Sequence, residues 1–64
     1  MVKINGENRN DEGKTVSEIL FSARYDPQRV AVECNGEIIP KSQYGNTVLQ
    51  EGDCVEIVRF VGGG

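Results

Sequence analysis

Two Asn-Gly dipeptides constrain the fold of this chain more than any other feature of its sequence. They are Asn5-Gly6 and Asn35-Gly36, and each lies between two strand-like runs. Because Asn and Gly tolerate the positive φ angles of a type I′ turn, each dipeptide predicts a tight hairpin. The four strands that the dipeptides connect are expected at residues 2–4, 7–10, 29–34 and 37–39. The run over 7–10 has no apolar residue, which favours an edge position in the sheet.

Between the hairpins the sequence carries the signals of one helix. Thr15 and Glu18 have the spacing of a capping box, so we expect the helix to begin directly after Thr15. Pro27 disfavours helical geometry in the residue before it, and we therefore expect the helix to end near Tyr25. Phe21 lies off the apolar stripe and is expected to pack beneath a loop. The residues of that stripe, at i, i+3, i+4 and i+7, are Val16, Ile19, Leu20 and Ala23.

The longest strand candidate covers residues 54–61 and follows a loop over 41–50 with a helical turn around Tyr44. One helix with a single apolar stripe covers one face of one sheet most economically. The order of elements therefore predicts an α+β fold of the β-grasp, ubiquitin-like kind, with one helix across a mixed sheet of four to five strands. In that fold the last strand lies centrally beside the first. We expect one domain over residues 1–61 and a flexible glycine tail over 62–64.

Composition excludes several classes of function. Ten acidic and seven basic side chains give a net charge of −3 without the basic stripe that nucleic acid binding requires. No apolar run approaches the roughly 20 residues that span a bilayer, so we expect no membrane partner and a cytoplasmic location. Histidine is absent, and Cys34 and Cys54 are too far apart for a Cys-x-x-Cys motif, so no metal or haem site is expected. Without histidine the chain is also not expected to be an enzyme.

Strand parity predicts which side chains of the final strand face a partner. Val55 and Ile57 should face the helix, whereas Val58 and Phe60 should face outward. The two outward side chains would form an exposed apolar spot near the end of the chain. Such a spot is typical of a protein–protein contact, so we predict that Val58 and Phe60 dock a partner.

The same parity argues against a disulfide. Cys34 shares a strand face with Val30 and Val32, which should be core, whereas Cys54 shares one with Glu56. Cross-strand cysteines that form a bond must point the same way. We therefore expect two free thiols, one buried and one partly exposed.

The sequence ends in three consecutive glycines, Gly62, Gly63 and Gly64. A segment without Cβ atoms is thin, and fully extended it reaches roughly 10 Å beyond Val61. It can enter a narrow channel and present a terminal carboxylate, ionised at neutral pH because its reference pKa is about 3.5. The pattern predicts that Gly64 is the reactive position and that other proteins' active sites act on it.

Two segments carry a resemblance to a known family. They are Asn-Gly-Glu-Ile-Ile-Pro-Lys-Ser-Gln-Tyr over 35–44 and Leu-Gln-Glu-Gly-Asp-Cys-Val-Glu-Ile-Val-Arg-Phe-Val-Gly-Gly-Gly over 49–64. They resemble the thiamine-biosynthesis sulfur carriers, the ThiS family of the ThiS/MoaD superfamily. Tyr44 stands where many members have tryptophan, and Gly62 where members often have alanine.

The resemblance implies a reaction cycle on the carboxylate of Gly64. A ThiF-type activating enzyme adenylates this carboxylate with ATP, and sulfur from a cysteine desulfurase or another donor displaces AMP to leave a thiocarboxylate. Thiazole synthase (ThiG) then takes the sulfur. The resemblance implies no permanently bound cofactor, a carrier that is a monomer by itself, and partner docking through Val58 and Phe60.

Three other functions use the same fold. The small subunit of molybdopterin synthase has the same tail and thiocarboxylate but is usually longer, so length favours the thiamine pathway. A ubiquitin-like modifier would form isopeptide bonds to lysines through Gly64. A plain interaction module would leave the tail unused.

Overall fold

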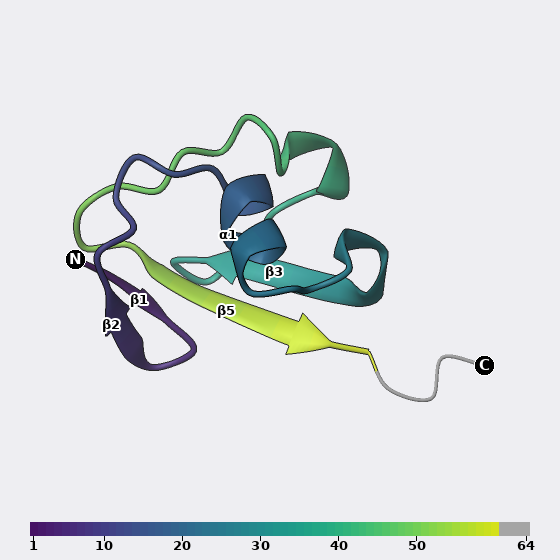
Figure 1. Ribbon diagram of the computed structural model, residues 1–64, viewed down its shortest axis with the longest axis horizontal. Coiled ribbons are helices and arrows are strands. Elements are labelled where there is room, and N and C mark those ends of the chain that lie inside the picture. Colours follow the sequence, from purple (N-terminus) through teal and green to yellow (C-terminus); the bar gives the residue numbers. More distant parts are fainter. Residues whose placement is uncertain (61–64) are drawn as a thin grey trace.

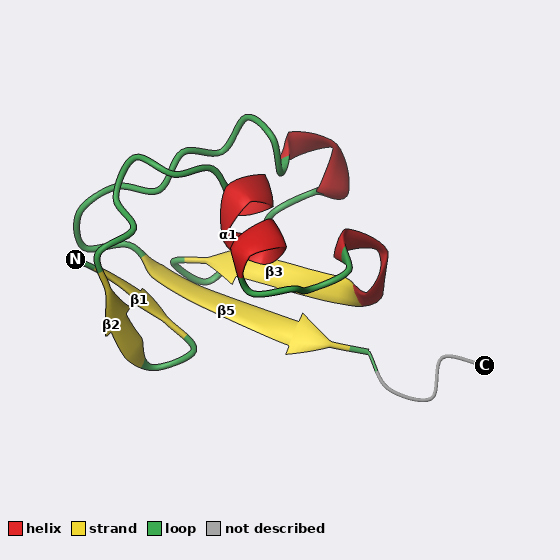
Figure 2. Ribbon diagram, viewed as in Figure 1, coloured by secondary structure: helices red, strands yellow, loops and turns green. Residues whose placement is uncertain are grey.

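The computed structural model describes residues 1–60, in which one face of a five-stranded sheet is covered by a single α-helix; the two other helical segments in Figure 2 are short 3-10 helices (Figure 1 and Figure 2). Residues 61–64, which include the predicted tail over 62–64, lie outside the described residues. The strands are β1 Val2–Ile4, β2 Glu7–Arg9, β3 Val30–Cys34, β4 Glu37–Ile38 and β5 Cys54–Arg59. Their order is β2-β1-β5-β3-β4, with β1 parallel to β5 and the other neighbours antiparallel. The predicted β-grasp, with the last strand beside the first, is confirmed.

Both Asn-Gly dipeptides form the predicted hairpin turns, with positive φ at each of the four residues. Their asparagine side chains also bind β5, which the sequence did not reveal. Asn5 Oδ1 accepts the Ile57 N–H at 2.7 Å, and Asn5 Nδ2 donates to the Ile57 carbonyl at 3.3 Å. On the other side of β5, Asn35 Oδ1 accepts the Cys54 N–H at 2.9 Å. The central strand is therefore held by backbone ladders and, beyond them, by an amide side chain on each side.

The helix α1, Val16–Ser22, begins where the capping box predicts. The Glu18 N–H donates to Thr15 Oγ1 at 3.1 Å, and the Thr15 N–H donates to Glu18 Oε1 at 2.8 Å. The loop after β4 also packs against this first turn, because the Ser17 N–H donates to the Tyr44 carbonyl at 2.9 Å. The start of α1 is thus fixed both by its own side chains and by a distant segment.

The predicted end of the helix near Tyr25 is wrong, because α1 ends at Ser22. Arg24 adopts a left-handed conformation with a φ of 63°. The Tyr25 N–H donates to the Leu20 carbonyl and the Arg24 N–H to the Phe21 carbonyl, which is the hydrogen-bond pattern of a Schellman motif. The left-handed conformation of Arg24 therefore ends the helix several residues before the position where Pro27 would disfavour it. The segment then forms a 3-10 turn, Pro27–Arg29, that leads into β3.

The core lies between α1 and the sheet. Its buried apolar residues are Val2, Ile4, Val16, Ile19, Leu20, Val30, Val32, Tyr44, Leu49, Val55 and Ile57. The predicted stripe fails at Ala23, which is exposed because it is the C-cap of a helix shorter than expected. Phe21 is 85% exposed, so the prediction that it packs beneath a loop is wrong. The loop after β4 contacts the first turn of α1 at Ser17 instead and leaves Phe21 uncovered.

Candidate functional site

The outward face of β5 carries the two predicted docking residues. Val55 and Ile57 are buried beneath α1, whereas Val58 is 53% and Phe60 is 54% exposed. This alternation confirms the predicted parity of the strand. Ala31 of β3 lies directly opposite Val58 and adds a small side chain beside it. Val58 and Phe60 thus form an exposed apolar spot at the end of the described chain, and their docking role stays a prediction.

Contacts with neighbouring segments fix the chain as far as Phe60. Its N–H donates to the Arg29 carbonyl at 2.9 Å, which continues the β3–β5 ladder past the end of β5. Lys41 Nζ lies 5.9 Å from the centroid of the Phe60 ring and 5.9 Å from that of Tyr44. The same ammonium donates to the Val30 carbonyl at 2.9 Å. The position from which residues 61–64 continue is therefore defined by backbone pairing and by a cation between two rings.

The predicted reactive residue Gly64 and the tail residues Gly62 and Gly63 lie outside the described residues. The structure instead places the strand that leads to them. β5 runs through the middle of the sheet and ends at the opposite side of the molecule from the N-terminus (Figure 1). The predicted reactive position thus follows the best-supported strand of the fold.

Both cysteines are free thiols, as predicted. Cys54 is exposed and Cys34 is partly buried, so each is more accessible than expected. Burial raises the pKa of the Cys34 thiol, and the negative charge of Asp53 raises it further. Cys34 is therefore protonated at neutral pH and is a poor nucleophile.

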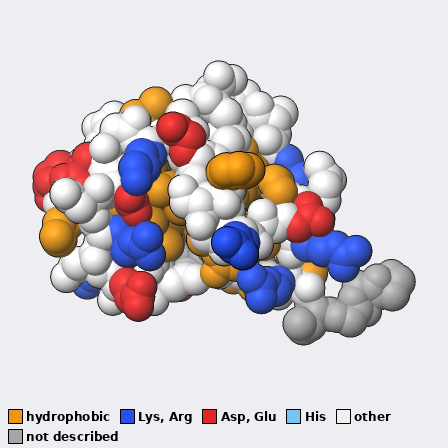
Figure 3. Space-filling model, in the orientation of Figure 1, with side chains coloured by type: hydrophobic (Ala, Val, Ile, Leu, Met, Phe, Trp, Pro, Cys, Tyr) orange, Lys and Arg blue, Asp and Glu red, His pale blue; other side chains and the backbone are white. Residues whose placement is uncertain are grey.

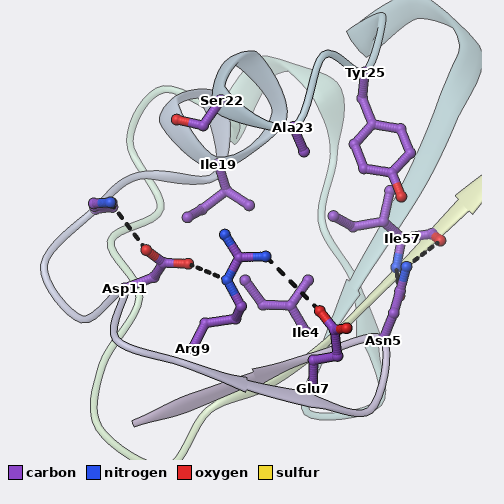
Figure 4. Close-up of a pocket in the computed structure, with 11 residues that line it drawn as sticks. Ile4, Asn5, Glu7, Arg9, Asp11, Ile19, Ser22, Ala23, Tyr25 and Ile57 are labelled. Atoms are coloured by element: carbon purple, nitrogen blue, oxygen red, sulfur yellow. Dashed lines mark hydrogen bonds and ion pairs between the residues drawn. The ribbon is translucent and has the colours of Figure 1, made fainter.

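A cavity of about 130 Å³ lies between the β1–β2 hairpin and α1, with Arg9 and Asp11 at its edge (Figure 4). Asp11 is the one buried charged residue of the described chain. Its carboxylate accepts a hydrogen bond from Lys14 Nζ at 2.9 Å and lies 3.5 Å from Arg9 Nε. The Asp-x-x-Lys spacing was the only signal of this cluster in the sequence. Arg9 also lies 3.9 Å from a carboxylate oxygen of Glu7, so the cluster holds two cations and two carboxylates. Because these charges neutralise one another, the cluster ties the hairpin to the start of α1 and offers no free charge to a ligand.

Within residues 1–60, no group of three or more His, Cys, Asp or Glu side chains could hold a metal ion. In the same part of the chain, every helix is too short to cross a membrane.

Comparison with known proteins decides the family. The model of the ThiS family matches residues 2–64. This chain belongs to the ThiS family. The sulfur carrier protein ThiS of Bacillus subtilis is 40% identical over 67 residues, which cover 100% of both chains. The crystal structure of the thiamine biosynthesis protein ThiS from Geobacter metallireducens matches with a TM-score of 0.78 and 31% identity, over 98% of this chain and 97% of that one.

A second kind of relative is much longer than this chain. A thiazole synthase of Paramagnetospirillum magneticum is 48% identical over 62 residues, which are 95% of this chain but 19% of that protein. The chain spans about a fifth of the length of the thiazole synthases that it matches. The ThiS relative of B. subtilis, by contrast, matches over its whole length and is named a sulfur carrier rather than an enzyme.

Proposed function

We propose that this chain is a sulfur carrier of thiamine biosynthesis that works through the carboxylate of Gly64. The observation that carries the proposal is the ThiS family match, which extends over residues 2–64 and so includes the three terminal glycines. Two features of the described chain support it. The sequence lacks histidine, the side chain most often used in acid–base catalysis, and the strand that leads to Gly64 is central in the sheet.

In the proposed cycle the chain is a substrate at each step. A ThiF-type enzyme binds ATP, an oxygen of the Gly64 carboxylate attacks the α-phosphorus, and pyrophosphate leaves. The terminal sulfur of a persulfide on a cysteine desulfurase or another donor then displaces AMP from the acyl-adenylate and forms an acyl disulfide. A second thiol cleaves this S–S bond, so the thiocarboxylate is released and the two cysteines are left as a disulfide. Thiazole synthase takes this sulfur into the thiazole ring. The chain itself holds no cofactor, since ATP belongs to the activating enzyme.

The longer relatives support thiazole synthase as the acceptor. In the thiazole synthases of P. magneticum and Magnetococcus marinus, a segment similar to this chain is part of the same polypeptide. Covalent linkage raises the effective concentration of two modules that must meet. If this chain is a separate carrier, it would transfer sulfur to a separate thiazole synthase after the two proteins bind each other.

Intact mass measurement tests the proposed function. After incubation with ATP, a ThiF-type enzyme and a sulfur source, the chain should gain the mass difference of one sulfur that replaces one oxygen. The ThiS protein of B. subtilis, incubated in parallel with the same enzyme, is the positive control. A ladder of conjugates to lysines would support a modifier instead. An unchanged mass, under conditions in which the B. subtilis protein gains sulfur, would contradict the proposal.

Truncation of the apolar spot tests the docking role of Val58 and Phe60. Each side chain is about half-exposed. Burial of the exposed half against a partner should contribute about 1 kcal/mol of binding free energy for each residue. The double variant Val58→Ala/Phe60→Ala should therefore raise KM for the activating enzyme about tenfold or more, with little change in kcat. Val48→Ala is the matched control, because Val48 is 49% exposed but lies in the loop after β4. Equal losses in both variants would argue against a specific docking surface.

A further inference from the structure

Charged residues are sorted along β5 in a way that the sequence does not display. Four of the seven basic residues but one of the ten acidic residues lie around the end of β5, so this region has a net charge of +3. The remaining three basic and nine acidic residues carry −6. We call the four cations the basic collar. They are Arg24, Arg29, Lys41 and Arg59, and the carboxylate among them is Asp26.

Strand register and one ring contact bring three members of the collar to the end of β5. Arg59 of β5 lies opposite Val30, the residue that follows Arg29. The Arg59 guanidinium carbon is 4.9 Å from the centroid of the Tyr25 ring, and Tyr25 follows Arg24 in the chain. Stacking on the ring leaves the N–H donors of Arg59 free at its edges. Lys41 is the fourth member, placed by its contact with the Phe60 ring described above.

The opposite end of β5 is acidic. Glu33 and Glu56 are directly opposite each other across β3 and β5, although like charges in this position disfavour the pairing. Glu51 and Asp53 lie immediately before the strand begins. Figure 3 shows Lys and Arg side chains gathered close to the place where the described chain ends. An acidic protein therefore has a positive region at the end of the strand that leads to Gly64.

We propose that the basic collar docks on an acidic rim of Asp and Glu side chains around the entrance to the adenylation site of the activating enzyme. The proposal rests on the function proposed above. Covalent geometry keeps Gly64 within about 14 Å of Phe60, so any enzyme that reacts with Gly64 must bring its entrance against the collar. The anionic carboxylate must also approach the anionic phosphates of ATP. Attraction between collar and rim offsets this repulsion and orients the encounter.

The arrangement of the cations favours a protein rim over a bound phosphate group. They come from four separate segments: the end of α1, the 3-10 turn, the loop after β4, and β5. Lys41 and Arg59 each lie against a different aromatic ring, and these contacts keep the two charges apart from each other. The collar also adjoins the apolar spot, because Lys41 lies beside the Phe60 ring and Arg59 stands between Val58 and Phe60 in the chain. The partner surface that fits is therefore an apolar patch with carboxylates next to it.

Charge reversal at two exposed positions of the collar tests this proposal. Arg24→Glu/Arg29→Glu changes two exposed side chains. The control Lys3→Glu/Asn10→Glu/Gln50→Glu makes the same change in net charge at exposed positions away from the end of β5. The probe is the ATP-loaded ThiF-type enzyme that adds sulfur to the wild-type chain. At low ionic strength the collar variant should associate at least about tenfold more slowly than the wild type, and the control less than about threefold. Near 0.5 M salt the difference should largely disappear.

Three further results decide the interpretation. Arg24→Lys/Arg29→Lys keeps the charge and should restore the wild-type rate, and thermal unfolding should show that every variant is folded. Three outcomes would overturn the proposed docking role of the collar: an equal loss of association rate in the collar and control variants, an unchanged rate in the collar variant, or a loss that persists at high salt. A wild-type chain that gains no sulfur would instead overturn the proposed function and the partner with it. The two failures are distinct, because the first leaves the mass change of the wild type intact.

Discussion

Deletion of Gly63 and Gly64 should abolish thiocarboxylate formation and leave the fold unchanged. The buried core is built by residues 2–57, so it does not depend on the last two residues. The deletion moves the terminal carboxylate about 7 Å toward β5 at roughly 3.5 Å per residue. A displacement of about 1 Å at a reacting centre can already cost about a hundredfold in rate. Intact mass after incubation with ATP, the activating enzyme and a sulfur source should therefore show no sulfur gain.

The control for this deletion is a substitution that keeps the length of the chain. Gly62→Ala adds one methyl group at a position where members of the family often have alanine, and it should retain sulfur gain. Thermal unfolding midpoints of both variants should lie within about 2 °C of the wild type, because neither change touches the core. A truncated chain that still gained sulfur would move the reactive group away from Gly64 and refute the proposed mechanism.

Much of the fold could be predicted because its signals are local. The capping box joins Thr15 and Glu18 within one turn, and each Asn-Gly dipeptide contains the conformations that its turn requires. The exposure of Val58 and Phe60 follows from alternation along one strand. These features depend on residues a few positions apart, so the sequence is sufficient to derive them.

The errors arose where the outcome depends on distant segments. Arg24 ends the helix in a left-handed conformation. Glycine is the usual residue at such a position, so an arginine gives no sequence signal that the helix ends there. Phe21 is exposed because of the path taken by the loop after β4. The hydrogen bonds from Asn5 to Ile57 join residues 52 positions apart. No rule of local spacing reveals such a partner.

The candidate site also combines features that the sequence predicts with features that depend on distant segments. The role of Gly64 is a prediction from the glycine run and the family resemblance, whereas the exposure of the apolar spot follows from the parity of β5. The basic collar could not be seen, because its four cations are spread along the chain from Arg24 to Arg59. They meet only after Arg59 pairs with Val30 and the backbone of Phe60 pairs with that of Arg29. Strand register, rather than composition, creates this positive region.

The same substitution should affect two neighbouring residues of α1 to very different extents. Leu20 is fully buried in the centre of the core, whereas Phe21 is 85% exposed. Leu20→Ala should lower the free energy of unfolding by about 2–5 kcal/mol, since it removes buried apolar area and leaves a cavity. Phe21→Ala should change it by less than about 0.5 kcal/mol. Urea unfolding followed by circular dichroism measures both values.

The expected loss at Leu20 is large relative to what holds this fold together. A seven-residue helix is too short to be stable alone, so α1 persists only while its stripe packs on the sheet. The core of a chain this small supplies only about 3–5 kcal/mol, so Leu20→Ala should leave much of the protein unfolded at 25 °C. It should then fail to gain sulfur although Gly64 is intact, whereas Phe21→Ala should gain it normally. A stable and active Leu20→Ala variant would show that the packing of Leu20 on the sheet is not needed to hold β5 in place.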